Sequence, residues 1–337
     1  MSRVTNQPLR FLSCDWGTSS FRLRLIDAVT FSVLGESRSE EGIGATHSAW
    51  KQAGGKTELR WDYYQEVIRR HLVILKERGG VPLEGVPLIV SGMASSSIGW
   101  VELPYKELPF ATDGSDLRAE VVAATVALPH AVAIISGACT TEDVMRGEET
   151  QLIGALTGEE QAEGTRRLFI LPGTHSKHLV VERSKVIELM TYMTGEFFNL
   201  LSRQSILSAS VETGSNFDST ENREAFALGV QRGSAQNILH SGFGVRVRTL
   251  LGTTSKTSNY HYLSGLLIGS ELGEHRPTSI PVTIVGSGPL ATCYRDAIQV
   301  LGGTVTTKSI DADEATIKGQ WKIALKLGLR LGLGQSD

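Results

Sequence analysis

Two short turns rich in glycine and hydroxyl side chains contain residues that could bind an anion. The first turn spans residues 15–20 and the second spans residues 172–177. Each lies between two runs that read as β-strands, so both turns are predicted to be the tips of β-hairpins. A Gly-Thr-Ser tip exposes backbone N–H groups and hydroxyls with no bulky Cβ in the way. One tip in each half of the chain predicts a polyphosphate site that is held from two sides.

An acidic residue, Asp15, ends the strand before the first tip. Magnesium in phosphate sites is usually bound by one or two carboxylates together with phosphate oxygens and water. Asp15 is therefore a candidate to hold Mg²⁺ through water. The alternative is an Asx-turn, in which the carboxylate bonds nearby backbone and needs no metal.

Charged side chains gather at residues 143–149, between the two tips in the sequence. Gly147 interrupts the local structure, and a helix is predicted to begin at about Glu148. Its small residues Gly154, Ala155 and Gly158 would let a second helix cross closely, which suits a hinge between domains. Acids at a helix N-terminus can simply complement the helix dipole. Their place between two predicted anion sites favours a functional acid.

A third glycine turn, at residues 285–289, follows an apolar strand and opens a predicted helix. Gly286 and Gly288 could let a flat base or a ribose approach the backbone. The turn lacks the third glycine of the dinucleotide fingerprint, because position 291 is Ala. The chain also has no G-x-x-x-x-G-K-[ST] motif, so a P-loop is excluded as the phosphate site. A plain strand-to-helix connection remains the alternative for this turn.

Composition indicates an ordinary globular protein. The 337 residues suggest two domains, with 41% hydrophobic and 20% charged residues. A net charge of −3 argues against a general nucleic-acid binder. The three cysteines are widely spaced and fit a reducing compartment better than a disulfide framework or a zinc site. No apolar signal region or membrane-spanning run is found, so we expect a cytoplasmic enzyme without membrane contact.

The order of elements predicts an α/β fold. In each half, three strands in a meander are followed by further strands and helices, the order of a ribonuclease-H-like domain. Two such domains are expected, at residues 1–158 and 159–337. The first is expected to have strands at 11–14, 21–26, 32–37, 87–90 and 131–135, and helices at 63–78 and 116–126. The second is expected to have strands at 168–171, 178–182, 185–191 and 282–285, and helices at 196–207, 223–239, 262–273, 290–301 and 313–329.

The succession of these motifs resembles the sugar kinase, actin and heat-shock-70 superfamily. Within it, the chain is similar to the 2-dehydro-3-deoxygalactonokinase family over almost its whole length. The segments that carry this similarity are 16–22, 91–93, 99–105, 143–151, 171–177, 193–197 and 262–269. The resemblance implies two ribonuclease-H-like domains flanking an ATP cleft. It also implies transfer of the γ-phosphoryl group of ATP to the 6-hydroxyl of 2-dehydro-3-deoxy-D-galactonate, in galactonate catabolism.

The same resemblance implies roles for single residues. Asp15 would organise Mg²⁺, and Glu148 would accept the hydroxyl proton, with Glu149 as its competitor. The residues implied to hold the phosphates are Gly17, Thr18, Ser19, Gly173, Thr174, His175, Ser176 and Lys177. Those implied to border the adenosine are Gly286, Ser287 and Gly288, and those implied to hold the sugar acid are Ser95, Ser96, Trp100, Tyr105 and Arg146.

The planar fork of Arg146 suits a carboxylate because it can bond both oxygens. A salt bridge with Asp143 or Glu149 is the alternative role of Arg146. Other functions also stay open: a kinase for a related 2-keto-3-deoxy sugar acid, a nucleotide-switched ATPase of the actin or chaperone kind, and a phosphohydrolase. The expected partner is a small-molecule sugar acid, with a second copy of the chain in a homodimer as an option.

Overall fold

The computed structural model describes residues 9–79, 82–157, 166–213, 217–252, 254–274, 280–303 and 308–328. The chain divides into two compact units, of which unit 1 comprises Met1–Ala162, Ser184–Ile187 and Ala312–Asp337. Unit 2 comprises Glu163–Arg183 and Glu188–Asp311. The expected domain boundary at 158/159 lies outside the described residues. The last helix, expected in the C-terminal domain, groups with unit 1 because it packs on a helix of that unit.

Unit 1 is built on a six-stranded sheet in the order β3-β2-β1-β4-β8-β7. Strands β1, β2 and β3 form an antiparallel meander, and β4 and β8 continue the sheet in parallel to β1. The strand bounds are β1 Arg10–Trp16, β2 Phe21–Asp27, β3 Val33–Ser39, β4 Leu88–Gly92, β7 Ala119–Val122 and β8 Val132–Ile135. The five strands expected in the first half are therefore confirmed.

Four α-helices belong to the described part of unit 1: α1 Ile43–Gln52, α2 Arg60–Gly79, α3 Glu148–Ala155 and α10 Ala312–Lys326. Helix α2, expected at 63–78, buries Val67, Ile68, Leu72 and Leu75 in the core that covers the sheet. Short strands β5 Lys106–Glu107, β9 Ala138–Cys139 and β10 Val144–Met145 form a separate three-stranded sheet. Two 3₁₀ turns, η1 Thr57–Leu59 and η2 Met93–Ser95, complete the unit.

The prediction of a helix at residues 116–126 is wrong. Residues Ala119–Val122 form β7, which pairs antiparallel with β8 from Ala119↔Ile135 to Val122↔Val132. Alanine and glutamate favour a helix locally, but pairing along β8 supplies these backbone groups with hydrogen-bond partners. The tertiary contact therefore decides the structure of this segment.

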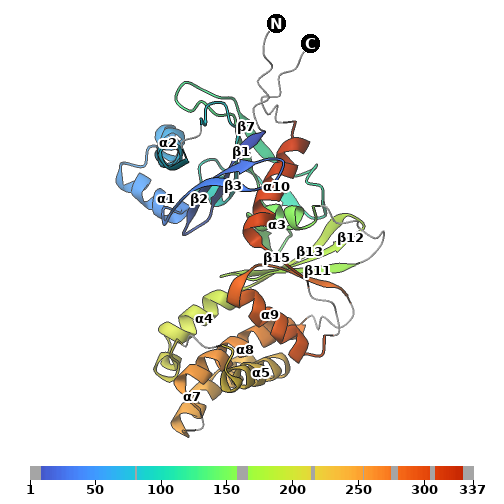
Figure 1. Ribbon diagram of the computed structural model, residues 1–337. Helices are drawn as coiled ribbons and strands as arrows, with labels where there is room; N and C mark the ends of the chain where they lie inside the picture. Colours follow the sequence, from blue (N-terminus) through green and yellow to red (C-terminus); the bar gives the residue numbers. More distant parts are fainter. Residues whose placement is uncertain are drawn as a thin grey trace. The chain divides into compact units, whose positions relative to one another are not determined.

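Helices α3 and α10 pack closely through small residues (Figure 1). A Cβ on Gly154 would clash with the carbonyl oxygen of Ala315, and one on Gly319 would clash with that of Thr150. The predicted close crossing at Gly154 and Ala155 therefore has its partner in the last helix of the chain. Gly158, the third small residue named for this crossing, lies outside the described residues.

Unit 2 repeats the strand order of unit 1. Its sheet runs β15-β14-β11-β12-β13, which matches β8-β4-β1-β2-β3 position by position. Strands β11 and β12 are antiparallel, whereas β14 and β15 extend the sheet in parallel to β11. The bounds are β11 Arg167–Leu171, β12 Ser176–Glu182, β13 Lys185–Tyr192, β14 Val282–Val285 and β15 Lys308–Ile310. The first residues of β13, grouped with unit 1, pair with β6 Phe110–Ala111.

Helices account for most of unit 2. They are α4 Thr194–Arg203, α5 Thr220–Ala235, α6 Ile238–Ser241, α7 Gly244–Leu250, α8 Lys256–Glu274 and α9 Gly288–Val300, with the 3₁₀ turn η3 Ile206–Ser210. Helices α5 and α8 lie side by side (Figure 1), and a Cβ on Gly229 or Gly265 would clash with backbone of the opposite helix. The helix expected at 223–239 is divided, because α5 ends at Ala235 and the Asn237 side chain caps α6.

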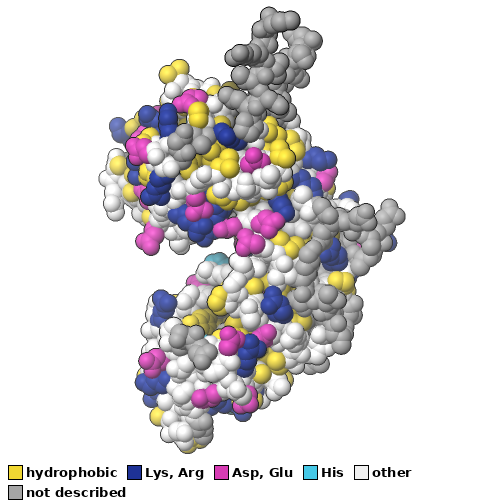
Figure 2. Space-filling view, viewed as in Figure 1, with side chains coloured by type: hydrophobic (Ala, Val, Ile, Leu, Met, Phe, Trp, Pro, Cys, Tyr) yellow, Lys and Arg dark blue, Asp and Glu magenta, His cyan; other side chains and the backbone are white. Residues whose placement is uncertain are grey.

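On the face drawn in Figure 2, acidic and basic side chains are interspersed over both units. Within the described ranges, no helix is long and apolar enough to cross a membrane.

Candidate active site

The first predicted tip connects β1 and β2, as expected. Gly17 N donates to Ser20 O at 2.9 Å and closes the turn, and the side chain of Thr18 is exposed. Helix α1 begins directly against this tip, where Ile43 N donates to Gly17 O at 2.9 Å. A Cβ on Gly42 would clash with the carbonyl oxygen of Thr18, so only glycine permits this approach. The start of α1 thereby supports the backbone of the tip, whereas Thr18 and Ser19 are exposed to solvent.

Asp15 lies at the end of β1 with its side chain 22% exposed. Its Oδ2 lies 3.4 Å from Nη1 of Arg22, and the same nitrogen lies 3.2 Å from Oδ1 of Asp313. Burial raises the pKa of Asp15, and the positive charges of Arg22 and Arg24 oppose this rise. Among the described residues, no backbone N–H donates to this carboxylate, so the Asx-turn is not formed.

Arg22 and Asp313 were not identified as site residues from the sequence. Arg22 could have been found, because a hairpin with its tip at 17–20 sets it directly opposite Asp15 in register. Asp313 lies 291 residues away from Arg22, and no local pattern predicts that pairing. Asp313 also binds Arg24 Nη2 at 2.5 Å, which ties the start of α10 to strand β2.

The two glutamates after Gly147 lie in different environments. Gly147 has a φ of +110°, and a Cβ there would lie 3.4 Å from the Cα of Gly92. Glu149 is 1% exposed and accepts hydrogen bonds from Gly147 N at 3.0 and 2.8 Å and from Thr150 Oγ1 at 3.0 Å. Glu148 is only partly buried, and its Oε2 accepts from Arg146 N at 3.0 Å.

Burial raises the pKa of Glu149 to about 7, and the neighbouring charge of Glu148 adds to the effect. The Glu149 carboxylate thus serves the turn at the start of α3, whereas Glu148 keeps access to solvent. This geometry favours Glu148 over Glu149 as a group that meets a substrate.

Arg146 clamps the loop that follows η2. Its Nη1 donates to Ser95 O at 2.5 Å and to Ser95 Oγ at 2.7 Å, and its Nη2 donates to Leu103 O at 3.1 Å. The guanidinium carbon lies 4.0 Å from the ring centroid of Tyr105. Within the described residues Arg146 forms no ion pair, so neither alternative salt bridge is present. The structure therefore brings Ser95, Tyr105 and Arg146 together.

Ser96 and Trp100 are not part of that group. Ser96 is buried, and its Oγ donates to Met93 O at 2.7 Å within the same turn. Trp100 is 2% exposed, its Nε1 donates to Trp61 O at 3.2 Å, and its ring packs at 4.7 Å from the ring of Trp61. Trp100 thus lies in the hydrophobic core, where its packing on Trp61 helps to position the loop that follows η2.

The second tip connects β11 and β12, as predicted. A Cβ on Gly173 would meet no atom within 4 Å, and Thr174 and His175 are exposed. Ser176 and Lys177 instead lie at the start of β12 with buried side chains. Their side chains therefore point into unit 2, although Thr174 and His175 remain at its surface.

Helix α4 begins against the second tip as α1 does against the first. Glu196 N donates to Thr174 O at 3.0 Å, and a Cβ on Gly195 would clash with Gly173 O. The ring Nε2 of His175 lies 2.5 Å from Oε2 of Glu196. The two units thus support their tips in the same way, with a glycine at the start of a helix.

The third glycine turn connects β14 to α9. Gly286 N donates to Ile310 O at 2.8 Å, and Gly288 begins α9 with a φ of +68°. Ser287 and Gly288 are exposed, and a Cβ on Gly288 would meet no atom within 4 Å. This turn is therefore open to a ligand.

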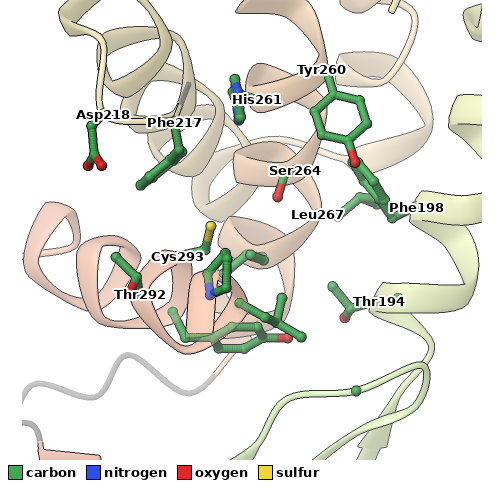
Figure 3. Close-up of a pocket in the computed structure, with 16 residues that line it drawn as sticks. Thr194, Phe198, Phe217, Asp218, Tyr260, His261, Ser264, Leu267, Thr292 and Cys293 are labelled. Atoms are coloured by element: carbon green, nitrogen blue, oxygen red, sulfur yellow. The ribbon is translucent and has the colours of Figure 1, made fainter. Parts of the chain in front are cut away.

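A cavity of about 670 Å³ lies within unit 2 and is lined by residues of both the second tip and α9. Its walls are mostly apolar and aromatic, as is usual for a small-molecule site. Figure 3 shows Phe217 and Tyr260 on opposite sides of the cavity, with Thr292 and Cys293 on a further wall. Gly173 and Pro289 also line it, so the cavity joins the second tip to the third turn.

Comparison with known proteins defines the class. The activator of 2-hydroxyisocaproyl-CoA dehydratase from Clostridium difficile, solved with bound ADPNP, has a TM-score of 0.50 over 97% of this chain and 99% of its own, at 9% identity. The crystal structure of a Sinorhizobium meliloti protein that carries the name 2-dehydro-3-deoxygalactonokinase has a TM-score of 0.75 over 97% of this chain and 98% of its own, at 32% identity. The expected fold, that of the sugar kinase and actin-like superfamily, is confirmed.

The family follows from sequence. The family model for 2-keto-3-deoxy-galactonokinase matches residues 15–323. DgoK1 of Rhizobium meliloti strain 1021, named a probable 2-dehydro-3-deoxygalactonokinase, is 34% identical over 92% of this chain and 94% of its own length. The 2-dehydro-3-deoxygalactonokinase of Escherichia coli K12 is 30% identical over 90% of this chain and 94% of its own length. The chain belongs to the 2-keto-3-deoxy-galactonokinase family.

Proposed function

We propose that this protein is a kinase that transfers the γ-phosphoryl group of ATP to the 6-hydroxyl of 2-dehydro-3-deoxy-D-galactonate. The observation that carries the proposal is the cavity of unit 2, which joins a glycine tip to a glycine turn in a chain of this kinase family. Two relatives that span most of the chain are named for that activity.

Unit 2 would hold the nucleotide. The apolar and aromatic walls of the cavity suit a purine. The exposed backbone at Ser287 and Gly288, which follows Gly286, suits a ribose or phosphate. The backbones of Gly173, Thr174 and His175 would hold phosphate oxygens. The activator that shares the fold was solved with ADPNP, which supports a nucleotide in this fold.

Unit 1 would hold Mg²⁺ through water at Asp15. Its carboxylate is partly exposed, and within the described ranges no cluster of three or more His, Cys, Asp or Glu side chains could hold a metal. A single carboxylate together with phosphates and water is the usual arrangement for Mg²⁺. The ion would neutralise phosphate charge, which is the main task in phosphoryl transfer. The backbones of Gly17, Thr18 and Ser19 would bind phosphate oxygens from this unit.

Glu148 would act as the general base for the acceptor hydroxyl. It is the more exposed of the two glutamates at the start of α3, and its bond to Arg146 N holds one oxygen in place. Tyr105 and Arg146 would border the sugar acid. The Ser95 side chain is buried and accepts from Arg146, so Ser95 would act by holding Arg146 and its loop in place. The cytoplasmic location and the homodimer stay predictions.

The test is an ADP-release assay over a panel of 2-keto-3-deoxy sugar acids with the purified full-length chain. We expect the highest kcat/KM for the galactonate derivative. A higher value for another member, such as the gluconate epimer, would assign the related kinase function instead. ADP release that needs no sugar acid would favour a nucleotide-switched ATPase.

A further inference from the structure

A buried carboxylate on α8 joins three elements of unit 2. Glu271 has its side chain 1% exposed. Its Oε1 accepts from Ser176 Oγ at 2.7 Å and from His178 Nε2 at 2.8 Å. Its Oε2 accepts from Thr194 Oγ1 at 2.5 Å and from Tyr294 OH at 2.7 Å. A carboxylate has about four acceptor sites, so these four donors fill its capacity.

The four donors lie where unit 2 would grip a nucleotide. Ser176 and His178 begin β12, directly after the second tip, and Thr194 begins α4, which supports that tip. Tyr294 lies on α9, the helix opened by the third glycine turn. The Glu271 side chain thus fixes the second tip, helix α4 and the third glycine turn relative to one another.

The bonding pattern requires Glu271 to act as an acceptor. Burial and the charge of Glu271 raise the pKa of Tyr294, so its hydroxyl stays protonated and donates. Removing a donor would leave a buried carboxylate oxygen less satisfied, which is costly for a charged group. The adjacent elements would then shift to recover the bond, and the tip would move with them.

We infer that Glu271 is the positioning residue that sets the second phosphate tip and the third glycine turn at the separation that a nucleotide requires. Its carboxylate is buried beneath the cavity wall, so it acts through Ser176, Thr194 and Tyr294 rather than on the ligand. The inference rests on the proposed nucleotide site of unit 2.

The experiment compares a substitution of this carboxylate and a substitution of one of its donors with a control on α7. Glu271→Gln keeps the shape of the side chain but replaces one acceptor oxygen by an NH₂ donor. Tyr294→Phe removes one hydroxyl and keeps the ring that lines the cavity. The control, Thr249→Val, removes a hydroxyl that accepts from the buried Asn259 on α8 at 2.8 Å, away from the tip. The probe is ADP, and its Kd is measured by titration calorimetry alongside Tm and both KM values.

We expect Glu271→Gln to weaken ADP binding about tenfold and Tyr294→Phe about fivefold. The KM for ATP should rise by similar factors, and the KM for the sugar acid should change less than about twofold. Thr249→Val should lower Tm about as much as Glu271→Gln and Tyr294→Phe do. Its Kd for ADP should be unchanged.

Unchanged ADP affinity in Tyr294→Phe would overturn the inference, even if Glu271→Gln fails to fold. Equal weakening in Thr249→Val would also overturn it, because the effect would then follow general destabilisation. A wild-type protein that does not bind ADP would instead contradict the proposed function itself, so the two failures are distinguishable.

Discussion

Both carboxylate oxygens of Glu149 accept a hydrogen bond from the backbone N–H of Gly147, at 3.0 and 2.8 Å. The side chain folds back over the turn that precedes α3 and is almost completely buried. It thereby satisfies a donor at the start of the helix and holds Gly147 in its positive-φ conformation. Glu148, one residue earlier, is left with the more accessible carboxylate.

The buried carboxyl of Glu149 makes stability depend on pH. Its pKa is raised from 4.5 to about 7, so between these values the folded protein holds a proton that the unfolded chain has lost. The stabilisation is present at low pH and is lost as the pH rises to about 7. Between pH 5 and pH 8, the free energy of unfolding of the wild type should fall by about 2–3 kcal/mol relative to that of Glu149→Gln.

Urea unfolding of both proteins at the two pH values measures this difference. Glu66→Gln is the control, because the Glu66 side chain is 54% exposed. The free energy of unfolding of Glu66→Gln should differ from that of the wild type by the same amount at both pH values. A pH-independent difference for Glu149→Gln would show that Glu149 is ionised throughout.

Glu148→Gln should lower kcat by on the order of 10²-fold or more, the scale of a lost general base. Glu149→Gln should lower kcat only severalfold, because its carboxyl serves the turn. ADP affinity should be unchanged in both variants. The opposite order of kcat values would place the base at Glu149, and two active variants would remove the base from this helix.

Asp15→Asn should abolish most of the Mg²⁺-dependent turnover while leaving the fold intact, since the amide keeps the shape but loses the charge. The control is Asp27→Asn at the far end of β2, where Asp27 accepts from Val29 N and Thr30 N in an exposed turn. Steady-state kinetics over a range of Mg²⁺ concentrations measures both variants. Near-normal activity of Asp15→Asn would exclude Asp15 as a magnesium residue.

The local patterns predicted the hairpins and the positions of the strands along the chain well, because both depend on short-range alternation and turn residues. The pairing of Ala119–Val122 with β8 was missed, since helix-favouring residues there are overridden by a distant strand. The core position of Trp100 was missed for a similar reason. A tryptophan beside polar residues resembles a ligand contact until its packing on Trp61 is seen. Single hydrogen bonds of Glu271 reach across 95 positions of the chain, so no sequence window contains the network.

Because α3 and α10 cross closely, no side chain larger than that of glycine should be tolerated at Gly154 or Gly319. Gly154→Ala and Gly319→Ala should each destabilise the protein by about 1–3 kcal/mol or more, because the added methyl clashes with helix backbone. Gly244→Ala on α7 is the control, since its Cβ would lie 3.6 Å from Tyr262 Oη in ordinary contact. Thermal unfolding should show a lowered Tm for the first two only. A Tm unchanged in all three would contradict the close packing.

Phosphoryl transfer to a sugar acid can be followed by ³¹P NMR of a complete reaction. ATP, Mg²⁺, 2-dehydro-3-deoxy-D-galactonate and the wild-type protein are incubated, and the phosphorus products are quantified. We expect one new phosphomonoester on the 6-oxygen for each ADP formed, with no ADP when the sugar acid is omitted. ADP formed together with inorganic phosphate, and no sugar phosphate, would contradict it.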